Sequence, residues 1–179
     1  MKILIVGYAA SGKSTFARKL RDHYNLPLLH IDTVSFDPGW VDVDRSVVEQ
    51  RIRAFMEDHD DWVIDGLYRR LATERFDMCD QLFIFDFNRF SCLWSAIRRR
   101  ITYHNKERES VAPGCKEKLD PGFIWWILHA GRKKNSRELF KTFKSRYKDK
   151  TVVFRNRRDV RRHLESIGAL PDPQNGVNR

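Results

Sequence analysis

The sequence has few of the residues that mark several classes of protein. Its 179 residues include only three cysteines, Cys79, Cys92 and Cys115, without a C-x-x-C pair, which fits neither a disulfide framework nor a zinc site. Glycine (9) and proline (6) are too scarce for a collagenous or low-complexity chain. Apolar runs such as 123–128 are far shorter than the ~18 residues of a membrane span, and residues 1–7 reach glycine too early for a signal peptide. We expect a cytoplasmic globular protein with reduced thiols and no membrane partner.

Acidic residues are scarce in the second half of the chain. The net charge is +10, from 34 Lys and Arg against 24 Asp and Glu. Residues 1–88 carry 11 basic and 15 acidic side chains, whereas residues 89–179 carry 23 basic and 9 acidic ones. Such an excess indicates an anionic partner, although part of it, between Arg137 and Lys150, is also compatible with a solvated helix face.

Short β-branched runs alternate with helical patterns along the chain. The expected strands cover 2–6, 28–31, 62–64, 81–87 and 151–154, and the expected helices cover 14–24, 45–58, 89–102, 122–147 and 157–167. Alternation of this kind predicts an α/β fold, in which a parallel sheet carries helices on both faces. We expect a single domain over residues 1–167 and a flexible tail over residues 168–179.

The strongest motif lies between the first expected strand and the first expected helix. Gly7-Tyr8-Ala9-Ala10-Ser11-Gly12-Lys13-Ser14 matches G-x-x-x-x-G-K-[ST]. In such a loop, backbone N–H groups and the helix N-terminus surround phosphate oxygens. We therefore predict ATP and Mg²⁺ as ligands, with Lys13 at the β- and γ-phosphates, Ser14 on the metal and Thr15 near the α-phosphate. The predicted nucleotide-binding residues of the loop are Gly7, Ala9, Ala10, Ser11, Gly12, Lys13, Ser14 and Thr15.

A phosphate loop needs an acidic partner for its magnesium at the end of a neighbouring strand. Asp65 and Asp86 both follow expected strands. We favour Asp65, because the turn that follows it contains Arg69 and Arg70, two cations that could hold an acceptor phosphate or a second nucleotide. Asp86 is more simply interpreted as a strand-end cap.

The second expected strand ends in His30-Ile31-Asp32. Ligands of open parallel sheets bind beyond the carboxyl ends of the strands, which makes Asp32 a candidate general base or a water-mediated ligand of Mg²⁺. A turn or helix cap is the alternative for Asp32. We expect His30 to be buried and hydrogen-bonded, while Trp40 either stacks on an acceptor ring or packs in the core.

Arginines are concentrated near the predicted nucleotide. At least one residue of Arg98–Arg100, which end a helix, should face the nucleotide, and we select Arg98. Arg108 lies in a charged loop, and Arg132 and Arg137 lie on the helix that follows it. Arginine on a transferring phosphoryl group is worth ~10³–10⁵ in rate, so we predict that Arg108 and Arg132 take part in catalysis together with Lys13.

Several segments together resemble one family. GYAASGKST, HID, WVIDGLYRR, QLFIFD and APGCKEKLDPGFIWWIL look like the corresponding segments of bacterial DNA topology modulation proteins, which are adenylate-kinase-like P-loop kinases. The resemblance covers residues 1–167. It implies a P-loop NTPase fold of the nucleotide kinase kind, with a five-stranded parallel sheet, an acceptor-binding insertion at about residues 33–60 and a lid at about residues 102–121.

The same resemblance assigns roles to individual residues. VIDGLYRR is similar to the D-G-[FY]-P-R segment of adenylate kinases, which would make Asp65 the magnesium-linked aspartate and Arg69 the acceptor-phosphate arginine. Tyr68 stands where that family has proline. Arg98 is similar to the arginine that packs against adenine, and Asp32 resembles the acidic residue with which kinases of small hydroxyl compounds activate their acceptor.

Three functions compete at this point. The first is ATP- and Mg²⁺-dependent phosphoryl transfer to a nucleotide or a small hydroxyl-containing acceptor, with Lys13, Asp32, Arg69, Arg108 and Arg132 as the catalytic residues. The second is a nucleic-acid-binding ATPase or polynucleotide kinase that uses the basic second half, in which case binding should weaken steeply with salt. The third, a GTPase switch, requires Asn-Lys-x-Asp, whereas residues 105–108 end in arginine.

Overall fold

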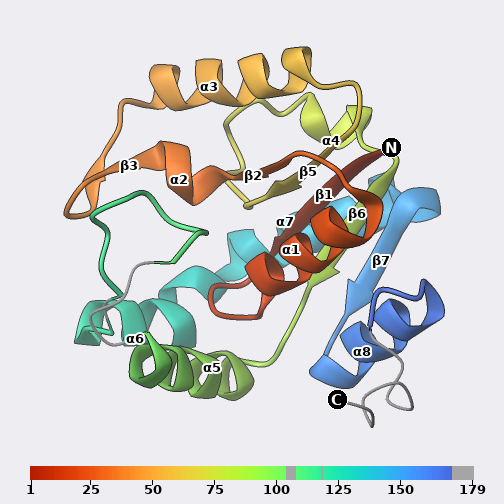
Figure 1. Ribbon diagram of the computed structural model, residues 1–179. Coiled ribbons are helices and arrows are strands. Elements are labelled where there is room, and N and C mark those ends of the chain that lie inside the picture. Colours follow the sequence, from red (N-terminus) through yellow and green to blue (C-terminus); the bar gives the residue numbers. More distant parts are fainter. Residues whose placement is uncertain (104–107, 118, 171–179) are drawn as a thin grey trace, which may run out of the picture.

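A parallel sheet lies at the centre of the molecule (Figure 1). The computed structural model describes residues 1–103, 108–117 and 119–170. Five strands lie in the order β2-β5-β1-β6-β7, and all their pairings are parallel. They are β1 (Lys2–Gly7), β2 (Leu28–His30), β5 (Trp62–Asp65), β6 (Gln81–Phe85) and β7 (Thr151–Phe154). The predicted α/β fold with a five-stranded parallel sheet is confirmed.

Helices cover both faces of the sheet. In the view of Figure 1, α1 and α8 lie in front of the sheet and α7 lies behind it. The longer helices are α1 (Lys13–Tyr24), α3 (Arg45–Asp58), α5 (Arg89–Thr102), α6 (Pro121–Leu128), α7 (Lys134–Arg146) and α8 (Arg157–Ser166). The short elements are α2 (Ile31–Ser35), α4 (Arg75–Met78), the 3-10 turns η1 (Ala130–Arg132) and η2 (Lys148–Lys150), and an antiparallel hairpin of β3 (Phe36–Asp37) and β4 (Val41–Asp42).

Aromatic packing fixes α1 on the sheet. Residues 3–6 of β1 are fully buried, as expected for a central strand of a parallel sheet. The Phe16 ring of α1 lies 5.0 Å from that of Phe83 and 5.4 Å from those of Phe85 and Phe154, so α1 rests on two neighbouring strands. The loop that joins β1 to α1 is therefore held at the carboxyl edge of the sheet, where ligands of such folds bind.

The predicted helix over 122–147 is wrong in one respect: it is two helices. α6 ends at Leu128 and α7 begins at Lys134, with η1 between them. The side chain of Arg132 folds back and its Nε donates to the Ile127 carbonyl at 3.0 Å, which satisfies a C-terminal carbonyl of α6. A Cβ at Gly131 would lie 3.0 Å from the Trp126 carbonyl, so the chain turns where a larger side chain would crowd it. The sequence does mark the break, because residues 129–138 contain Gly131 and no apolar residue except Ala130, and the prediction of one helix passed over this gap.

The other predicted elements agree with the structure to within two residues at their ends. The strand expected over 28–31 stops at His30 because α2 begins there, and the strand expected over 81–87 stops at Phe85. Residues 104–107 and 118 of the predicted lid, and residues 171–179 of the predicted tail, lie outside the described part of the chain. Among the helices that the structure describes, none is long and apolar enough to cross a membrane.

Candidate active site

The loop between β1 and α1 closes around the carbonyl of Tyr8. Ser11 Oγ donates to this oxygen at 2.8 Å, and Lys13 Nζ donates to it at 2.8 Å. Two glycines permit the path of the loop. Gly7 has φ +150° and a Cβ there would lie 2.5 Å from the Phe85 carbonyl, while Gly12 has φ +96°.

The first turn of α1 is open to an anion. Gly12, its N-cap residue, supplies no side-chain cap, and the first turn contains no acidic residue. Its first amides therefore lack the usual capping acceptor, and the helix dipole adds a partial positive charge at the same place. The motif predicted from the sequence thus has the geometry of an anion-binding loop.

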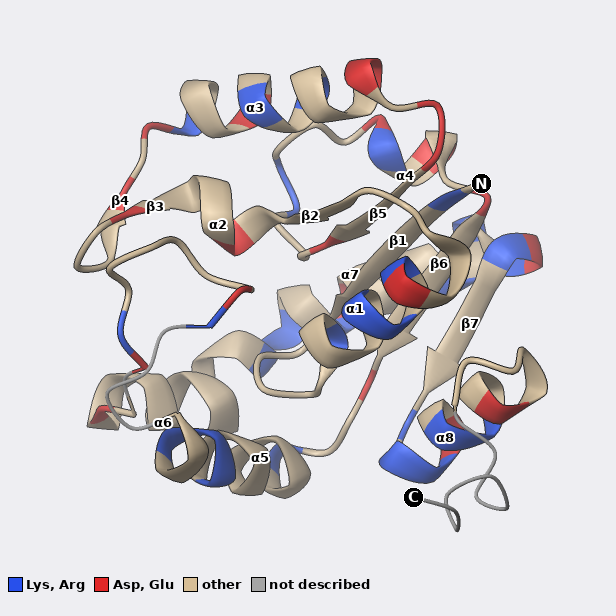
Figure 2. Ribbon diagram, viewed as in Figure 1, with Lys and Arg blue, Asp and Glu red and all other residues tan. Residues whose placement is uncertain are grey.

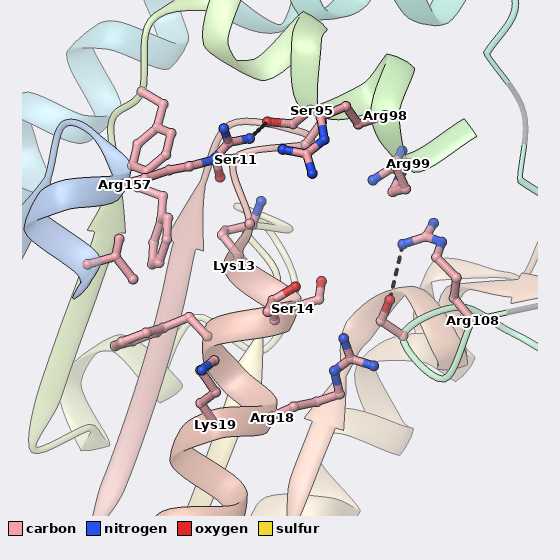
Figure 3. Close-up of a pocket in the computed structure, with 18 of the residues that line it drawn as sticks. Ser11, Lys13, Ser14, Arg18, Lys19, Ser95, Arg98, Arg99, Arg108 and Arg157 are labelled. Carbon is pink, nitrogen blue, oxygen red and sulfur yellow. Dashed lines mark hydrogen bonds between the residues drawn. The ribbon is translucent and has the colours of Figure 1, made fainter. Parts of the chain in front are cut away.

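A cavity of about 410 Å³ lies directly over this loop and is strongly basic (Figure 3). None of the described residues that line it is acidic. Its apolar side is formed by Phe16, Phe87, Val160 and Leu164. Seven cationic side chains line it: Lys13, Arg18, Lys19, Arg98, Arg99, Arg108 and Arg157. We call it the donor cavity, and its charge fits a polyanion such as a nucleoside triphosphate.

A second cavity, of about 630 Å³, lies on the other side of Lys13. It shares Lys13, Ser14, Arg99 and Arg108 with the donor cavity, so the two spaces meet at the phosphate loop. The rest of its wall includes two acidic residues, several aromatic residues and two further arginines: Asp32, Asp65, Trp40, Tyr68, Phe123, Trp126, Arg69 and Arg132. We call it the acceptor cavity.

Asp32 is held in the acceptor cavity by Tyr68. The Tyr68 hydroxyl donates to Asp32 Oδ1 at 2.8 Å. Burial raises the pKa of Asp32 above its usual value, while the hydrogen bond from Tyr68 and the charges of Lys13 and Arg108 oppose this rise. Burial likewise raises the pKa of Tyr68, which therefore stays a hydrogen-bond donor. A carboxyl group with a raised pKa, next to the phosphate loop, has the properties of a general base.

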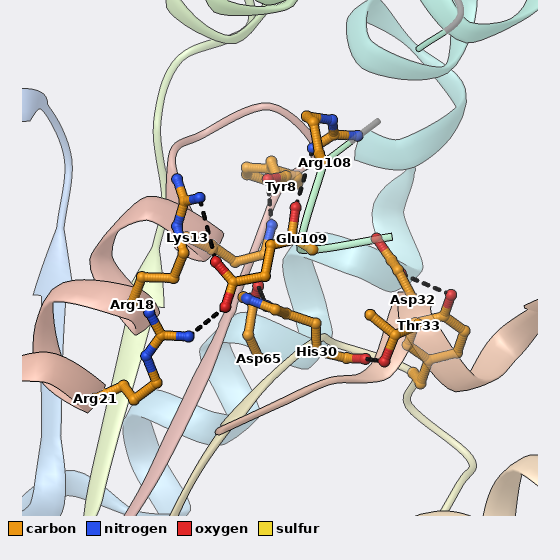
Figure 4. A network of polar contacts seen from close by, with 12 residues as sticks. Tyr8, Lys13, Arg18, Arg21, His30, Asp32, Thr33, Asp65, Arg108 and Glu109 are labelled. Carbon is orange, nitrogen blue, oxygen red and sulfur yellow. Dashed lines mark hydrogen bonds and ion pairs between the residues drawn. The ribbon is translucent and has the colours of Figure 1, made fainter. Parts of the chain in front are cut away.

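His30 and Asp65 form a buried pair at the carboxyl ends of β2 and β5. His30 Nδ1 lies 2.9 Å from Asp65 Oδ2, and both side chains are almost fully buried, as predicted for His30 (Figure 4). Asp65 Oδ1 is buried without a hydrogen-bond partner among the described residues. A buried carboxylate oxygen of this kind is available to a metal ion or to an ordered water.

Ser14 and Asp65 fit Mg²⁺. Both line the acceptor cavity, and they bring a hydroxyl and the unpartnered Oδ1, the oxygen ligands that Mg²⁺ prefers. Within the described residues there is no group of three His, Cys, Asp or Glu side chains able to hold a metal. Magnesium bound here would therefore take most of its ligands from phosphates and water, as it does in other phosphoryl-transfer sites.

A buried glutamate joins two arginines of the site. Glu117 Oε1 accepts from Arg99 Nε at 2.7 Å, and Glu117 Oε2 lies 2.7 Å from Arg108 Nε. The Glu117 side chain is 2% exposed, so these pairs are screened little by water. Arg108 also donates to the Ser110 hydroxyl at 3.2 Å. Glu117 thus holds both arginines at the place where the two cavities meet.

Residues 108–117 also contact both flanks of the site. Glu109 pairs with Arg21 and, at 3.7 Å, with Arg18 of α1 (Figure 4). On the other flank, Trp40 Nε1 donates to the Lys116 carbonyl at 2.8 Å, and the amide of Gly39 donates to the Gly114 carbonyl at 3.2 Å. The segment therefore connects α1 to the β3–β4 hairpin across the two cavities.

The predicted arginines have different surroundings. Arg98 is exposed and lines the donor cavity, and Arg69 is exposed and lines the acceptor cavity. Arg132 lines the acceptor cavity but is buried, and its guanidinium donates to the carbonyls of Ile127 and Phe87 and lies 3.7 Å from the centre of the Tyr8 ring. These contacts direct the Arg132 guanidinium at the protein itself, and the role predicted for it in catalysis stays a prediction.

Two other residues considered from the sequence lie away from the site. Asp86 accepts from Lys144 at 2.6 Å and lines neither the donor nor the acceptor cavity, which agrees with a structural role. Arg137 is exposed and also lines neither of them.

Three functional candidates were missed. Arg157, at the start of α8, lines the donor cavity and its Nη2 donates to Ser95 Oγ at 2.6 Å. A usable signal was present, because Arg157 follows the carboxyl end of a strand in a parallel sheet. Tyr68 and Glu117 had no such signal, since their importance depends on partners distant in the sequence.

Comparison with known proteins finds the same fold in a solved structure. No protein-family model and no curated protein matches the chain. Among solved structures, deoxyadenosine kinase from M. mycoides with bound dATP is similar at a TM-score of 0.57 and 13% identity, over 94% of this chain and 97% of the kinase. The chain has the same α/β fold as this kinase. An uncharacterized protein from Eubacterium ventriosum matches at a TM-score of 0.45 and 14% identity, over 95% and 99% of the two chains.

Proposed function

We propose that the protein is a Mg²⁺-dependent kinase that transfers the γ-phosphoryl group of ATP to a nucleotide or a small hydroxyl-containing acceptor. One observation carries the proposal: a phosphate loop in a cavity with seven cationic and no acidic described residues, joined at Lys13 to a second cavity that contains a hydrogen-bonded aspartate. The fold shared with a deoxyadenosine kinase supports it.

Each cavity has a defined role in this proposal. The loop amides, Lys13 and the arginines of the donor cavity bind the triphosphate and neutralise the charge of the transferring group. Asp32 accepts the proton of an acceptor hydroxyl as its oxygen bonds to the γ-phosphorus. Magnesium held by Ser14 and Asp65 would supply further charge neutralisation at the phosphates. Glu117 positions Arg99 and Arg108, and Tyr68 positions Asp32.

The test is the release of ADP from Mg·ATP over a panel of nucleosides, nucleoside monophosphates, small hydroxyl compounds and DNA. We expect one small acceptor to stimulate ADP release by the wild type, and Lys13→Ala to lose this stimulation while it stays folded. Lys141→Ala is the matched control, because Lys141 is an exposed lysine of α7 that lines neither cavity. Full stimulation in a folded Lys13→Ala variant would contradict the proposal.

A nucleic-acid-dependent ATPase or polynucleotide kinase is the second candidate. The observation in its favour is the concentration of basic residues at and before the start of α8 (Figure 2), where Arg157 lines the donor cavity. The exposed arginines there are Arg155, Arg157, Arg158, Arg161 and Arg162. This candidate predicts that DNA alone stimulates ADP release and that the effect falls steeply as salt rises. Stimulation by a small acceptor that persists in moderate salt excludes it as the main activity. The link to DNA topology has no support beyond the resemblance noted in the sequence.

A further inference from the structure

The exposed apolar side chains of the molecule are concentrated on two neighbouring helices. Eight large apolar side chains are exposed in the described part of the chain, and five of them lie on α5 and α6. On α5 they are Phe90, Trp94 and Ile101, which are 73%, 58% and 73% exposed. α6 packs beside α5 (Figure 1) and adds Trp125 and Trp126. Such a concentration indicates an interaction surface.

The apolar residues on the outer face of α5 form one stripe. They follow one another at spacings of four, three and four residues: Phe90, Trp94, Ile97 and Ile101. Because an α-helix turns by about 100° per residue, this spacing keeps all four within an arc of about 60°. Cys92 and Ala96 are buried on the inner face of the helix. The helix is therefore apolar on two opposite faces, of which the outer one is largely exposed.

The spacing of the stripe is the one with which two helices pair. Apolar residues at alternating spacings of three and four form a seam whose side chains interdigitate with those of a facing helix. Spacings of four, three and four read the same in both directions, so the stripe matches a second copy of itself in antiparallel orientation. Its first two residues are aromatic and its last two are isoleucines. The antiparallel pair therefore places Phe90 opposite Ile101 of the second copy and Trp94 opposite Ile97, a large side chain against a smaller one each time.

The charges of α5 favour the antiparallel over the parallel orientation. All the charged residues of the helix are arginines, one at its start and three near its end: Arg89, Arg98, Arg99 and Arg100. A parallel pair would bring residues 98–100 of both copies together at one end, where like charges repel each other. The antiparallel register places Arg89 opposite Thr102 of the second copy and Arg100 opposite Ser91. No two arginines then lie directly opposite each other across the seam.

We propose that two copies of this chain form a dimer through α5, with the two stripes paired in antiparallel orientation about a two-fold axis. A two-fold contact uses the same surface of both copies, so every residue of the stripe contributes twice. The four aromatic side chains of the seam would bury roughly 500 Å², somewhat under half of the ~1,200 Å² at which specific interfaces begin. The isoleucines and the flanking side chains add to this area. The interface is small, and we therefore expect a reversible dimer that forms at micromolar protein concentration.

The paired stripe leaves the candidate active site open. Arg99 lines both the donor and the acceptor cavity, and it lies about 180° around the helix from Phe90. The second copy would therefore contact α5 from the side that faces away from the two cavities. It would hold in place the helix that carries Arg98 and Arg99. The dimer does not depend on the proposed kinase function, and its test requires no activity.

The first arm of the test is analytical ultracentrifugation of the full chain from nanomolar to submillimolar concentration. We expect a monomer–dimer equilibrium, and we expect Trp94→Asp and Ile101→Asp each to raise its dissociation constant at least about 100-fold, because each change enters the interface twice. Met78→Asp is the matched control and should leave the constant unchanged, since Met78 is an exposed apolar residue of α4 outside the stripe. A wild type that stays monomeric throughout, or a dimer that both α5 variants retain, overturns the proposal.

The second arm determines the orientation by disulfide formation between introduced cysteines. The three native cysteines are buried, and the wild type under the same oxidation is the control. Phe90→Cys and Ile101→Cys proteins, one of them with an affinity tag, are oxidised separately and as a mixture. We expect a covalent dimer mainly in the mixture, because the antiparallel register brings residue 90 of one copy opposite residue 101 of the other. Efficient cross-linking of Phe90→Cys to itself would show a parallel contact and overturn the antiparallel pair.

The third arm tests an anionic lipid surface as the alternative occupant. Phe, Trp and Ile flanked by arginines are also typical of helices that lie on membranes. Co-sedimentation with vesicles of phosphatidylserine and phosphatidylcholine measures this binding for the wild type and Trp94→Asp. We expect no binding that depends on Trp94, because the dimer covers the stripe. A monomeric wild type that binds these vesicles through Trp94 would assign the stripe to a membrane and overturn the dimer.

Discussion

Substitution of Asp32 distinguishes a hydroxyl acceptor from a phosphate acceptor. A hydroxyl must lose a proton as it attacks, whereas a phosphate acceptor needs no base. We expect Asp32→Asn to lower kcat by about 10²–10⁴ if the acceptor is a hydroxyl, because the amide cannot accept the proton. The comparison is steady-state kcat with whichever acceptor of the panel stimulates ADP release by the wild type, at equal Mg·ATP. An unchanged rate in a folded variant would show that Asp32 is structural.

Tyr68 contributes through Asp32 and does not itself touch the transferred group. Removal of its hydroxyl leaves Asp32 Oδ1 without its donor at 2.8 Å and frees the carboxylate to rotate. A hydrogen bond to a charged group is worth about 1.5–3 kcal/mol, so we expect Tyr68→Phe to lower kcat at least about tenfold. KM for ATP should stay the same, since Tyr68 does not line the donor cavity. A change confined to KM for ATP would contradict this positioning role.

Individual site residues could be recognised from the sequence where their function depends on residues close to them along the chain. The loop from Gly7 to Thr15 is recognisable because its glycines, lysine and serine must occur at fixed spacing. Tyr68 and Glu117 were not recognisable, because Tyr68 acts on Asp32, 36 residues earlier in the chain, and Glu117 on Arg99, 18 residues earlier. The surroundings of Arg132 were equally hidden from the sequence: it lines the acceptor cavity, yet it is buried and donates to two backbone carbonyls.

Among the structural elements, residues 108–117 offer a pair of glutamates that differ mainly in burial. Glu117 is buried between Arg99 and Arg108. Glu109 pairs with arginines of α1, and its side chain is 50% exposed. We expect Glu117→Gln to destabilise the fold by about 3 kcal/mol, because it leaves two partly buried arginines without a counter-charge. Glu109→Gln, the control, should cost less than about 1 kcal/mol. Urea unfolding of both variants measures the difference, and equal small losses would show that Glu117 does not anchor the segment.

The contact between α8 and the sheet predicts a dependence of stability on pH. The His163 ring lies 5.0 Å from that of Phe83 and 5.5 Å from that of Phe154, and burial lowers its pKa below the usual value. As the pH falls through about 6.5, His163 therefore takes up a proton in the unfolded chain before it does so in the folded protein. Protonation stabilises the unfolded chain, so the free energy of unfolding decreases below about pH 6.5, whereas above this pH the full contribution of the buried neutral ring is retained.

His163→Gln removes the titrating group and serves as the comparison. We expect its free energy of unfolding to change less between about pH 7.5 and pH 5.5 than that of the wild type. Urea unfolding at several pH values across this range measures both curves. The same slope in both proteins would show that His163 does not contribute to the dependence.

The helices and strands were predicted well where the hydrophobic pattern ends at the same residue as the element itself. The helix over 45–58 and the strand over 151–154 match the structure, because an aspartate cap and a β-branched run mark them locally. The single helix expected over 122–147 failed because the prediction joined two apolar segments across residues 129–138, which contain Gly131 and almost no apolar residue.

Over the whole molecule, the unequal charge of the two halves has a structural explanation. The basic second half supplies Arg98, Arg99, Arg108 and Arg157, which line the same cavity as the phosphate loop from the first half (Figure 3). The sequence indicated an anionic partner from the total charge, but only the fold shows that these cations meet in one cavity. A nucleotide in this cavity should stabilise the folded state, because the cavity exists only in the folded protein and the unfolded chain cannot bind the nucleotide in this way.

The binding of a non-hydrolysable ATP analogue with Mg²⁺ tests most directly whether the donor cavity is a nucleotide site. Isothermal titration calorimetry of the wild type, Lys13→Ala and Lys141→Ala gives the dissociation constants. We expect Lys13→Ala to weaken binding at least about tenfold, or about 1.4 kcal/mol, and Lys141→Ala to leave it unchanged. Failure of the wild type to bind the analogue, or equal affinity in a folded Lys13→Ala variant, would contradict the assignment of the donor cavity.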